Sequence, residues 1–299
     1  MRIGILTTRD ESYPVNARLL AAGRREGYTI QLVHPLKCRP FIDGGGKLRL
    51  AYEGNGKLEI DVLLPRIGST IDDFELSVAA HLEAAGLCLL NTTRAVNIAR
   101  DKFWTLQTLA GAGIDVPKTE LLHRDSDLSL AVRSLGGFPL VLKPRRGRKG
   151  RGVALVEEEK TLAGSLAGLH GAGEALLLQE FIHGPDLRDL RVIVIRGKVI
   201  AAVRREPAAG DFRSNIGQGG EGHAVELTPQ ETAVAQRAAA AVKLDVAGVD
   251  LFSLPGRLYA LETNYTPGLV NVEAVSGVDV SGAIIRAAAE KFQERRSAP

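Results

Sequence analysis

Two acidic residues and an amide near the end of the chain have the types and spacing needed to bind a cation. Asp250 lies in the apolar run VAGVDLF, and Glu262 with Asn264 lies in LYALETN. Each run predicts a strand, and Pro255-Gly256 between them predicts a turn. Because strand residues two apart share a face, Glu262 and Asn264 point the same way. An antiparallel hairpin would also bring Asp250 opposite Glu262.

All three side chains offer oxygen donors. Mg²⁺ that accompanies nucleotide phosphates takes oxygen ligands, with one or two of them from protein carboxylates. The predicted hairpin therefore has the chemistry of a metal–phosphate site. The alternative is a pair of solvated carboxylates at a sheet edge, since acidic side chains are mostly exposed.

The bulk composition narrows the class of protein. A chain of 299 residues is long enough for two or three compact units, and 45% hydrophobic with 24% charged residues is typical of a globular protein. A net charge of +3 gives no general attraction to nucleic acid or to a membrane surface. Cys38, Cys88 and six scattered histidines supply neither a disulfide framework nor a histidine metal centre.

The sequence shows neither a signal peptide at its start nor an apolar run of membrane length. The opening MRIGILTT is too short for a signal peptide, and no apolar run approaches the roughly 20 residues of a membrane span. We therefore expect a cytoplasmic protein with no membrane segment.

The order of predicted elements divides the chain into three parts. Up to residue 97, strand and helix patterns alternate, which predicts an α/β unit around a mostly parallel sheet. Beyond Pro117, closely spaced strands such as PLVLK, ALLLQEF and LRVIVI predict α+β units on antiparallel sheet. A long Ala-rich helix follows Pro229, and a last helix spans about 279–295. The division is 1–97, 98–184 and 185–299.

The segment PRRGRKGRG, residues 144–152, carries glycines and five basic side chains between two predicted strands. Gly147, Gly150 and Gly152 allow a turn that exposes backbone N–H groups, which suits phosphate oxygens. Lys143 precedes the segment at the end of a strand, where a lysine is held firmly enough to bind phosphate. A solvated loop and a nucleic-acid contact are the alternatives.

Two further motifs carry polar groups at the ends of apolar runs. In LLLQEFI, Glu180 and Phe181 close a strand where an adenine and a ribose could bind, although a strand that merely ends in polar residues explains them equally well. Asp189 and Arg191 share a face of the next strand, and a surface ion pair between them is the simpler alternative. In GDFRSN, Arg213 and Asn215 are planar donors suited to an anionic reaction centre.

Taken in order, these motifs closely resemble those of RimK-like ATP-grasp ligases, the family of the ribosomal-protein glutamate ligase. The resemblance rests on PRIG, RDK, PLVLK, the Gly-rich loop, QEFI, DLR, GDFRSN, VAGVDL and ETNYTPGL, and it covers nearly the whole chain. It implies an ATP-grasp fold, α/β plus α+β, with an N-terminal pre-ATP-grasp domain.

The resemblance also implies a role for each matching residue. The implied metal ligands are Asp250, Glu262 and Asn264, which would hold two Mg²⁺ ions, with Mn²⁺ as a substitute. The implied ATP contacts are Lys102, Lys143, Gly147, Gly150, Gly152, Glu180, Phe181, Asp189 and Ser214. Arg213 and Asn215 would act on the transferred phosphate, and Arg66 and Arg191 would bind substrate.

Three departures from the family pattern concern the substrate. The Gly-rich loop carries more charge than usual, Asp72-Asp73-Phe74 follows PRIG, and TPGLVN replaces the usual Pro-Gly-Leu-Glu-Gly turn. The metal ligands are retained. The resemblance thus implies an ATP-dependent ligase that forms an acyl phosphate and joins glutamate or a related amino acid to a carboxylate acceptor, such as a protein C-terminus, a peptide or a small molecule.

Two other classes of function compete with the ligase. One is a catalytically silent nucleotide-binding module with a regulatory role, which the full set of metal ligands and lysines disfavours. The other is an RNA- or ribosome-binding protein that uses the basic loop, which the lack of interleaved aromatic residues disfavours. We expect an oligomer of identical chains, with no direct nucleic-acid or membrane partner.

Overall fold

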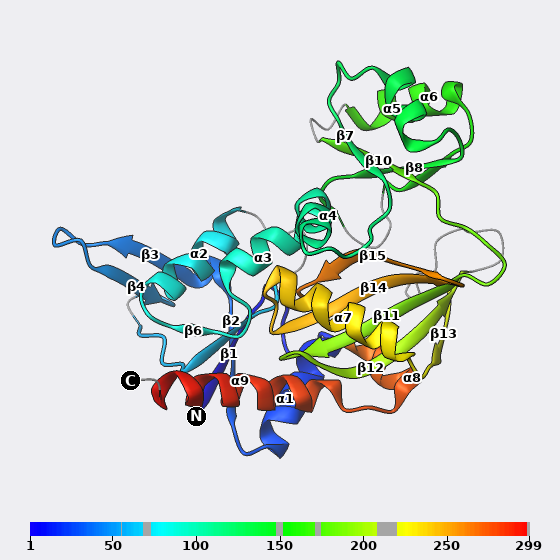
Figure 1. The fold of residues 1–299 in the computed structure, drawn as a ribbon. Coiled ribbons are helices and arrows are strands. Elements are labelled where there is room, and N and C mark those ends of the chain that lie inside the picture. The colour runs from blue at the N-terminus through cyan, green and yellow to red at the C-terminus, as the bar shows by residue number, and fades with distance from the viewer. Residues whose placement is uncertain (55, 68–72, 148–151, 171–174, 208–219, 298–299) are drawn as a thin grey trace.

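The computed structural model contains three β-sheets and a projecting hairpin (Figure 1). It describes residues 1–54, 56–67, 73–147, 152–170, 175–207 and 220–297. Figure 1 shows the sheet of the central unit raised above a larger body that holds the other two. Together with the matches to known proteins given below, this mixed α/β architecture agrees with the predicted fold class.

The N-terminal sheet is wholly parallel, with strand order β2-β1-β5-β6. Its strands are β1 (Arg2–Leu6), β2 (Thr29–Val33), β5 (Val62–Pro65) and β6 (Cys88–Leu89). Its helices are α1 (Pro14–Arg25), α2 (Asp73–Ala84) and α3 (Thr93–Ala99). Ile3 and Ile5 face the α1 side and Leu6 the opposite side, so the sheet is buried on both faces, as expected of parallel strands.

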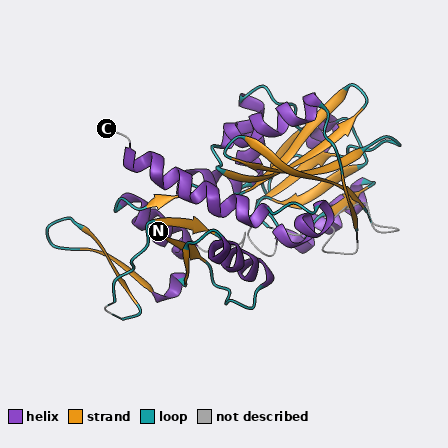
Figure 2. Ribbon diagram, turned by 90° about the horizontal axis from the view of Figure 1, so that it is seen from below, coloured by secondary structure: helices purple, strands orange, loops and turns teal. Residues whose placement is uncertain are grey.

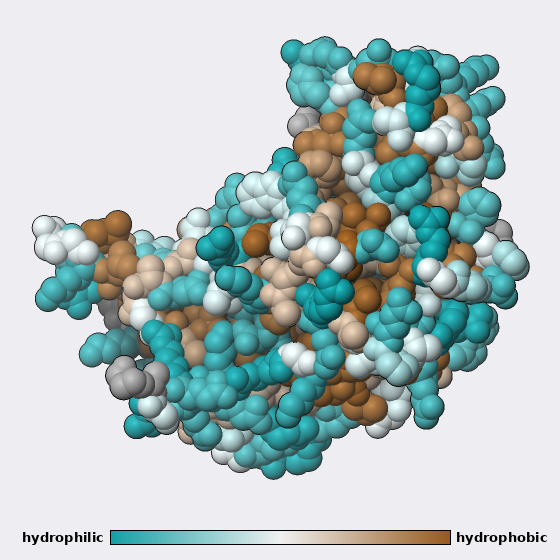
Figure 3. All heavy atoms as spheres, in the orientation of Figure 1, coloured by the Kyte–Doolittle hydropathy of each residue, from teal (hydrophilic) through white to brown (hydrophobic). Residues whose placement is uncertain are grey.

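A β-hairpin lies between β2 and β5. It consists of β3 (Cys38–Ile42) and β4 (Leu48–Tyr52), preceded by the short 3-10 helix η1 (Pro35–Lys37). The hairpin projects from the body in both ribbon views (Figure 2). Phe41 and Ile42 are exposed near its tip, where hydrophobic side chains appear on the otherwise largely hydrophilic surface (Figure 3).

The central sheet is antiparallel, in the order β7-β10-β8-β9, and has a core of its own. Its elements are β7 (Thr119–Leu122), α5 (Leu128–Leu135), β8 (Leu140–Pro144), β9 (Ala154–Val156), α6 (Glu159–His170) and β10 (Leu176–Glu180). Helix α4 (Lys102–Gly111) leads into it from the N-terminal unit. Leu140, Leu142 and Leu178 contribute to this core, which is separate from the cores of the other two sheets.

The C-terminal sheet is also antiparallel, in the order β13-β12-β11-β14-β15. Its strands are β11 (Arg188–Ile195), β12 (Lys198–Glu206), β13 (Glu221–Ala224), β14 (Val246–Leu254) and β15 (Arg257–Asn264). Its helices are α7 (Pro229–Val242), α8 (Leu269–Ser276) and α9 (Val280–Ser297). The predicted antiparallel character is confirmed, whereas the sequence predicted only a turn where α8 forms.

The N-terminal and C-terminal units share two hydrophobic cores. One joins Leu6 and Val78 to Val192 and Val249, and the other joins Ile5 to residues of α9. Helix α9 lies against α1, β5 and β6, so the last helix completes the first sheet. Both chain ends lie at the same end of the molecule (Figure 2). The sequence-based boundaries at 97 and 184 stay a prediction.

One buried amide links the two units. Asn91, only 3% exposed, donates through Nδ2 to the carbonyls of Val246 (3.0 Å) and Tyr265 (3.2 Å). Its Oδ1 accepts from the backbone N–H groups of Asp245 (2.9 Å) and Val246 (3.0 Å). The side chain therefore satisfies four backbone groups that would otherwise be buried without partners.

We expect Asn91→Ala to lower the free energy of unfolding by about 3 kcal/mol, because several backbone groups lose their partners inside a closed interface. Urea unfolding followed by circular dichroism measures the change. Gln236→Ala is the matched control, since that amide makes one exposed bond to Gly197 O (2.7 Å). Equal stability losses in the two variants would contradict the role given to Asn91.

Within the described ranges, no helix combines the length and the apolar character that crossing a bilayer demands.

Candidate active site

The β14–β15 hairpin brings the predicted ligands together. Asp250 pairs with Glu262 in the register of the two strands, as the sequence predicted. Asn264 lies on the same side and donates through Nδ2 to Glu262 Oε1 at 2.8 Å. A bulge follows Asp250, where bulges commonly redirect side chains near active sites.

Two arginines from neighbouring strands hold Asp250. Arg191, opposite Asp250 in the β11–β14 register, donates through Nε to Oδ1 and through Nη2 to Oδ2 (2.8 Å). Arg205 of β12 lies 3.4 Å from Oδ2 through Nη1, and its Nε and Nη2 donate to Asp189 Oδ1 at 3.0 and 2.5 Å. Asp189 and Arg191 are therefore not a surface pair, because each has a largely buried partner on another strand.

The pKa values of the two aspartates are shifted in opposite directions. Burial favours the protonated form of Asp250, but the charges of Arg191 and Arg205 outweigh it and lower the pKa. Burial dominates at Asp189 and raises its pKa to about 6, despite the charge of Arg205. Asp250 is thus anionic at neutral pH, as a ligand for a cation must be.

The cluster of Asp250, Glu262 and Asn264 fits a hard divalent cation by its donor chemistry. Two carboxylates and one amide stand side by side on adjacent strands, and all offer oxygen. Among the described residues, no group of three or more His, Cys, Asp or Glu side chains forms a metal site. The cluster suits Mg²⁺, which also takes oxygens from phosphates.

Lys143 approaches this cluster from the central sheet. It lies at the end of β8, and its Nζ donates to Gln179 Oε1 at 2.8 Å, while Gln179 donates to Thr119 Oγ1 at 2.6 Å. Burial lowers the pKa of Lys143 to about 8; Glu262 opposes the shift and the ammonium of Lys102 adds to it. The lysine on one sheet and the carboxylate on the other are therefore close enough to influence each other.

The shifted pKa predicts a pH dependence of nucleotide binding. Below pH 8 the Lys143 ammonium is present in the free protein, and a bound phosphate would keep it protonated to higher pH. We therefore expect ATP affinity to fall as pH rises above about 8, by up to about tenfold per pH unit. Calorimetric titration in two buffers should detect proton uptake. Lys143→Arg should abolish the dependence, because guanidinium stays charged.

Lys102 lies at the first turn of α4 and points to the start of the basic loop. Its Nζ donates to the carbonyl of Gly147 at 2.9 Å. Gly147 (φ 147°) and Gly152 (φ 71°) adopt backbone conformations that favour glycine. Helix α4, which carries Lys102, packs against β15, the strand of Glu262 and Asn264. Gly150 lies outside the described residues.

The predicted adenine-contacting pair lies where the central sheet meets the C-terminal unit. Glu180 ends β10, and its Oε1 accepts from the backbone N–H of Lys118 at 2.8 Å. Phe181 stacks on His183 with ring centroids 5.4 Å apart. Both residues therefore belong to the connection between the two parts. Arg213, Ser214 and Asn215 lie outside the described residues, so their predicted roles stay predictions.

Arg66 follows β5 directly and reaches toward the turn after β15. Its Nη2 donates to the carbonyl of Pro267 at 3.0 Å, and burial lowers its pKa to about 10. It stays charged at neutral pH. None of the ion pairs found between described residues includes Arg66. A partly buried cation in this setting suits a carboxylate supplied from outside.

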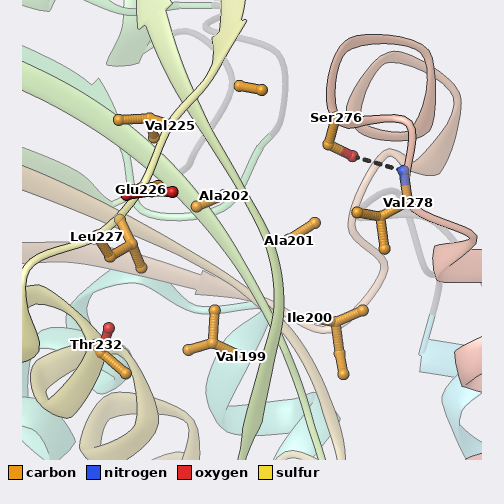
Figure 4. A pocket seen from close by; sticks show the side chains of 11 residues that line it. Val199, Ile200, Ala201, Ala202, Val225, Glu226, Leu227, Thr232, Ser276 and Val278 are labelled. Atoms are coloured by element: carbon orange, nitrogen blue, oxygen red, sulfur yellow. Dashed lines mark hydrogen bonds between the residues drawn. The ribbon is translucent and has the colours of Figure 1, made fainter.

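A cavity of about 580 Å³ lies away from these residues, on the side of the C-terminal unit formed by β12, the segment after β13 and the end of α8 (Figure 4). Its lining is mainly apolar, with Ile200, Val225, Leu227 and Val278 among the side chains. It has no lysine or arginine among its lining residues, so it is unsuited to a triphosphate.

Sequence reasoning missed three residues that shape the site. They are Arg205, Gln179 and Asn91, and the available signal for Arg205 and Gln179 was a polar residue at the end of an apolar run. Asn91, in CLLN, offered the same signal. Their partners come from strands far away in the sequence, which no local pattern reveals.

Comparison with known proteins gives a consistent assignment. The family model of the RimK PreATP-grasp domain matches residues 1–96, and that of the RimK-like ATP-grasp domain matches residues 99–288. The chain is 37% identical over 285 residues to a probable alpha-L-glutamate ligase of Trichodesmium erythraeum, covering 95% of each chain. It is 39% identical over 286 residues to a probable alpha-L-glutamate ligase of Xanthomonas euvesicatoria, covering 96% of each.

Solved structures show the same fold. The ATP-grasp ligase PsnB, complexed with a minimal precursor, superposes with a TM-score of 0.73 at 19% identity, over 97% of this chain and 98% of that one. D-alanine–D-alanine ligase of Bacillus anthracis, complexed with ATP, gives a TM-score of 0.73 at 20% identity, over 99% and 98%.

Proposed function

The chain belongs to the RimK-like ATP-grasp family, and we propose from that premise that it joins the amino group of glutamate to a carboxylate acceptor. It is an ATP-dependent ligase that forms an amide bond. The name of the curated relatives supports glutamate as the amine. The observation that carries the proposal is the Asp250–Glu262–Asn264 cluster on one sheet, together with Lys143 of the other sheet, whose pKa the charge of Glu262 affects.

The reaction needs activation, because joining a carboxylate to an amine in water is unfavourable. An acceptor carboxylate oxygen attacks the γ-phosphorus of ATP, and ADP leaves, giving an acyl phosphate. The amine then attacks the acyl carbon, inorganic phosphate leaves, and the amine loses a proton. Alignment and charge neutralisation dominate phosphoryl transfer, so this chain needs positioned cations more than covalent groups.

The residues divide these tasks. Lys143 and Lys102 would neutralise phosphate oxygens, with Gln179 orienting Lys143. Asp250, Glu262 and Asn264 would hold Mg²⁺, which supplies positive charge against the phosphates when bound. We assign Arg213 and Asn215 to the transferred phosphoryl group, with Ser214 beside them.

The other nucleotide contacts and the remaining arginines complete the assignment. We place Gly147, Gly150 and Gly152 along the phosphates, and Glu180 and Phe181 near the nucleoside. The buried pair that Asp189 makes with Arg205 gives it an indirect role, in which it steadies the arginine beside Asp250. Arg191 likewise holds Asp250 rather than substrate.

The acceptor is proposed to carry a carboxylate that Arg66 binds. PsnB, a ligase of the same fold, is described in complex with a peptide precursor, which supports a peptide or protein C-terminus as one acceptor class. We also propose that two Mg²⁺ ions take part, that Mn²⁺ can replace them, and that the chain acts as an oligomer in the cytoplasm.

An ADP-release screen tests the proposal. Purified protein with ATP and Mg²⁺ is offered glutamate and other amino acids against small acids and peptides, and mass spectrometry identifies the product. We expect ADP formation that depends on both substrates, with a mass increase equal to glutamate less water. Coupling of another amino acid in place of glutamate would overturn the choice of amine. If the protein binds ATP but forms no ADP with any pair of amino acid and carboxylate, it is not an active ligase.

A further inference from the structure

A fully buried aspartate marks the start of α4. Asp101 is 0% exposed, and its Oδ1 accepts from the backbone N–H groups of Phe103 and Trp104, both at 3.1 Å. This is the side-chain cap that begins the helix. The cap uses one oxygen only, and the second oxygen, Oδ2, faces the basic loop.

Arg145, the first basic residue of that loop, is committed to Asp101. Its Nε lies 2.6 Å from Asp101 Oδ2, without hydrogen-bond alignment, so the attraction is that of a close ion pair. Its guanidinium also lies over the ring of Trp104, 5.5 Å from the centroid, within the range of a cation–π contact. The side chain is 27% exposed. Arg145 is therefore directed toward α4 and not toward solvent.

Two more contacts join the same segments. The backbone N–H of Lys102 donates to the carbonyl of Arg145 at 3.1 Å, and Lys102 Nζ donates to the carbonyl of Gly147 at 2.9 Å. The Asp101–Arg145 pair thus lies next to both lysines assigned to the phosphates. Lys102 follows Asp101 directly, and Lys143 lies two residues before Arg145 on β8.

We propose that Arg145 is a positioning residue, which fastens the start of the basic loop to α4 through Asp101 and Trp104 so that Lys102 and Lys143 converge on the same phosphates. The inference rests on the proposed function, because it gives the two lysines a common ligand. It also explains part of the unusual charge of PRRGRKGRG: its first arginine binds the protein itself and is not offered to RNA or phosphate.

Arg146 provides a matched control. It is adjacent in sequence and carries the same charge, but it is 46% exposed and its Nε lies 3.9 Å from Asp101 Oδ2. A general effect of loop charge would act through both arginines. A fastening contact acts through Arg145 alone.

Trp104 reports the contact directly, since it is the only tryptophan of the chain. Removing the guanidinium in Arg145→Ala should expose one face of the indole and shift its emission to longer wavelength. Arg146→Ala should leave the emission unchanged. This readout needs no substrate, so it tests the contact even if the proposed reaction fails.

The kinetic test uses ATP dependence. We expect Arg145→Ala to raise the KM for ATP by about tenfold, because two lysines lose their alignment, and to leave the KM for the acceptor unchanged. Arg145→Lys should recover part of the loss through the ion pair alone. In the double variant Asp101→Asn/Arg145→Ala, the rise in the KM for ATP should be smaller than the product of the two single rises, because both substitutions break the same contact.

Two results would overturn the proposal. One is an equal rise of the ATP KM in Arg145→Ala and Arg146→Ala, which would indicate loop charge. The other is a rise of the ATP KM in the double variant that equals the product of the rises in the two single variants. If wild-type protein releases no ADP with any substrate, the proposed function fails, while the emission shift still decides whether the contact exists.

Discussion

Replacing Asp250 by Asn together with Glu262 by Gln is expected to reduce turnover by at least about 10³-fold. Both substitutions keep the size of the side chains and remove the negative charges that face Lys143 and the two arginines. Loss of a single preorganised electrostatic contact typically costs 10²–10³ in turnover, and here two are lost together. ADP release at saturating ATP and substrates measures the effect.

Stability must be separated from catalysis in this test. Asp250→Asn leaves Arg191 and Arg205 with less compensating charge in a buried place, which costs on the order of 3 kcal/mol. Glu262→Gln is milder for the fold, because Glu262 is only partly buried. Glu221→Gln, an exposed carboxylate on the same sheet, is the control. If the folded double variant still joins the substrates at the wild-type rate, the metal cluster takes no part in the mechanism.

Arg66→Ala is expected to raise the KM for the carboxylate acceptor about 100-fold and to leave the KM for ATP unchanged. The guanidinium is partly buried, charged at neutral pH and bonded to the Pro267 carbonyl, so an incoming carboxylate gains a strong, charge-assisted partner. Losing one member of such a pair costs about 2–5 kcal/mol. Steady-state kinetics with each substrate varied in turn separates the two KM values.

Arg66→Lys distinguishes charge from geometry. Lysine keeps the positive charge but cannot bind a carboxylate through two parallel N–H groups, so it should recover only part of the affinity. A change in the KM for ATP alone would show that Arg66 binds the nucleotide and not the acceptor. A loss of stability without any change in either KM would reduce Arg66 to its contact with Pro267.

The parts of the fold predicted from sequence depend on short-range patterns. The Asp250–Glu262 register followed from a turn and from the period of two, both contained within some fifteen residues. The parallel N-terminal sheet followed from alternating strand and helix patterns. The position of Lys143 at a strand end followed from PLVLK and is confirmed.

The parts that sequence missed depend on distant neighbours or weak local signals. Helix α8 begins at Leu269 after Pro267-Gly268, where Gly268 offers no side-chain cap, so the segment looked like a turn. Asp189 and Arg191 have the spacing of a local pair, but their partners lie on β12 and β14. Tertiary packing decides whether such residues pair locally or across strands. The partners on other strands cannot be predicted from the local pattern of a single sequence.

The packing of α9 against β5, β6 and α1 has a consequence for how the protein is made. A ribosome releases the first parallel strands long before it releases residues 280–297, yet these strands bury one face on that helix. The N-terminal unit therefore waits, with apolar surface uncovered, until α9 has been synthesised. Such a nascent chain needs protection from aggregation, because all the intervening strands and helices are synthesised before the first sheet can be covered.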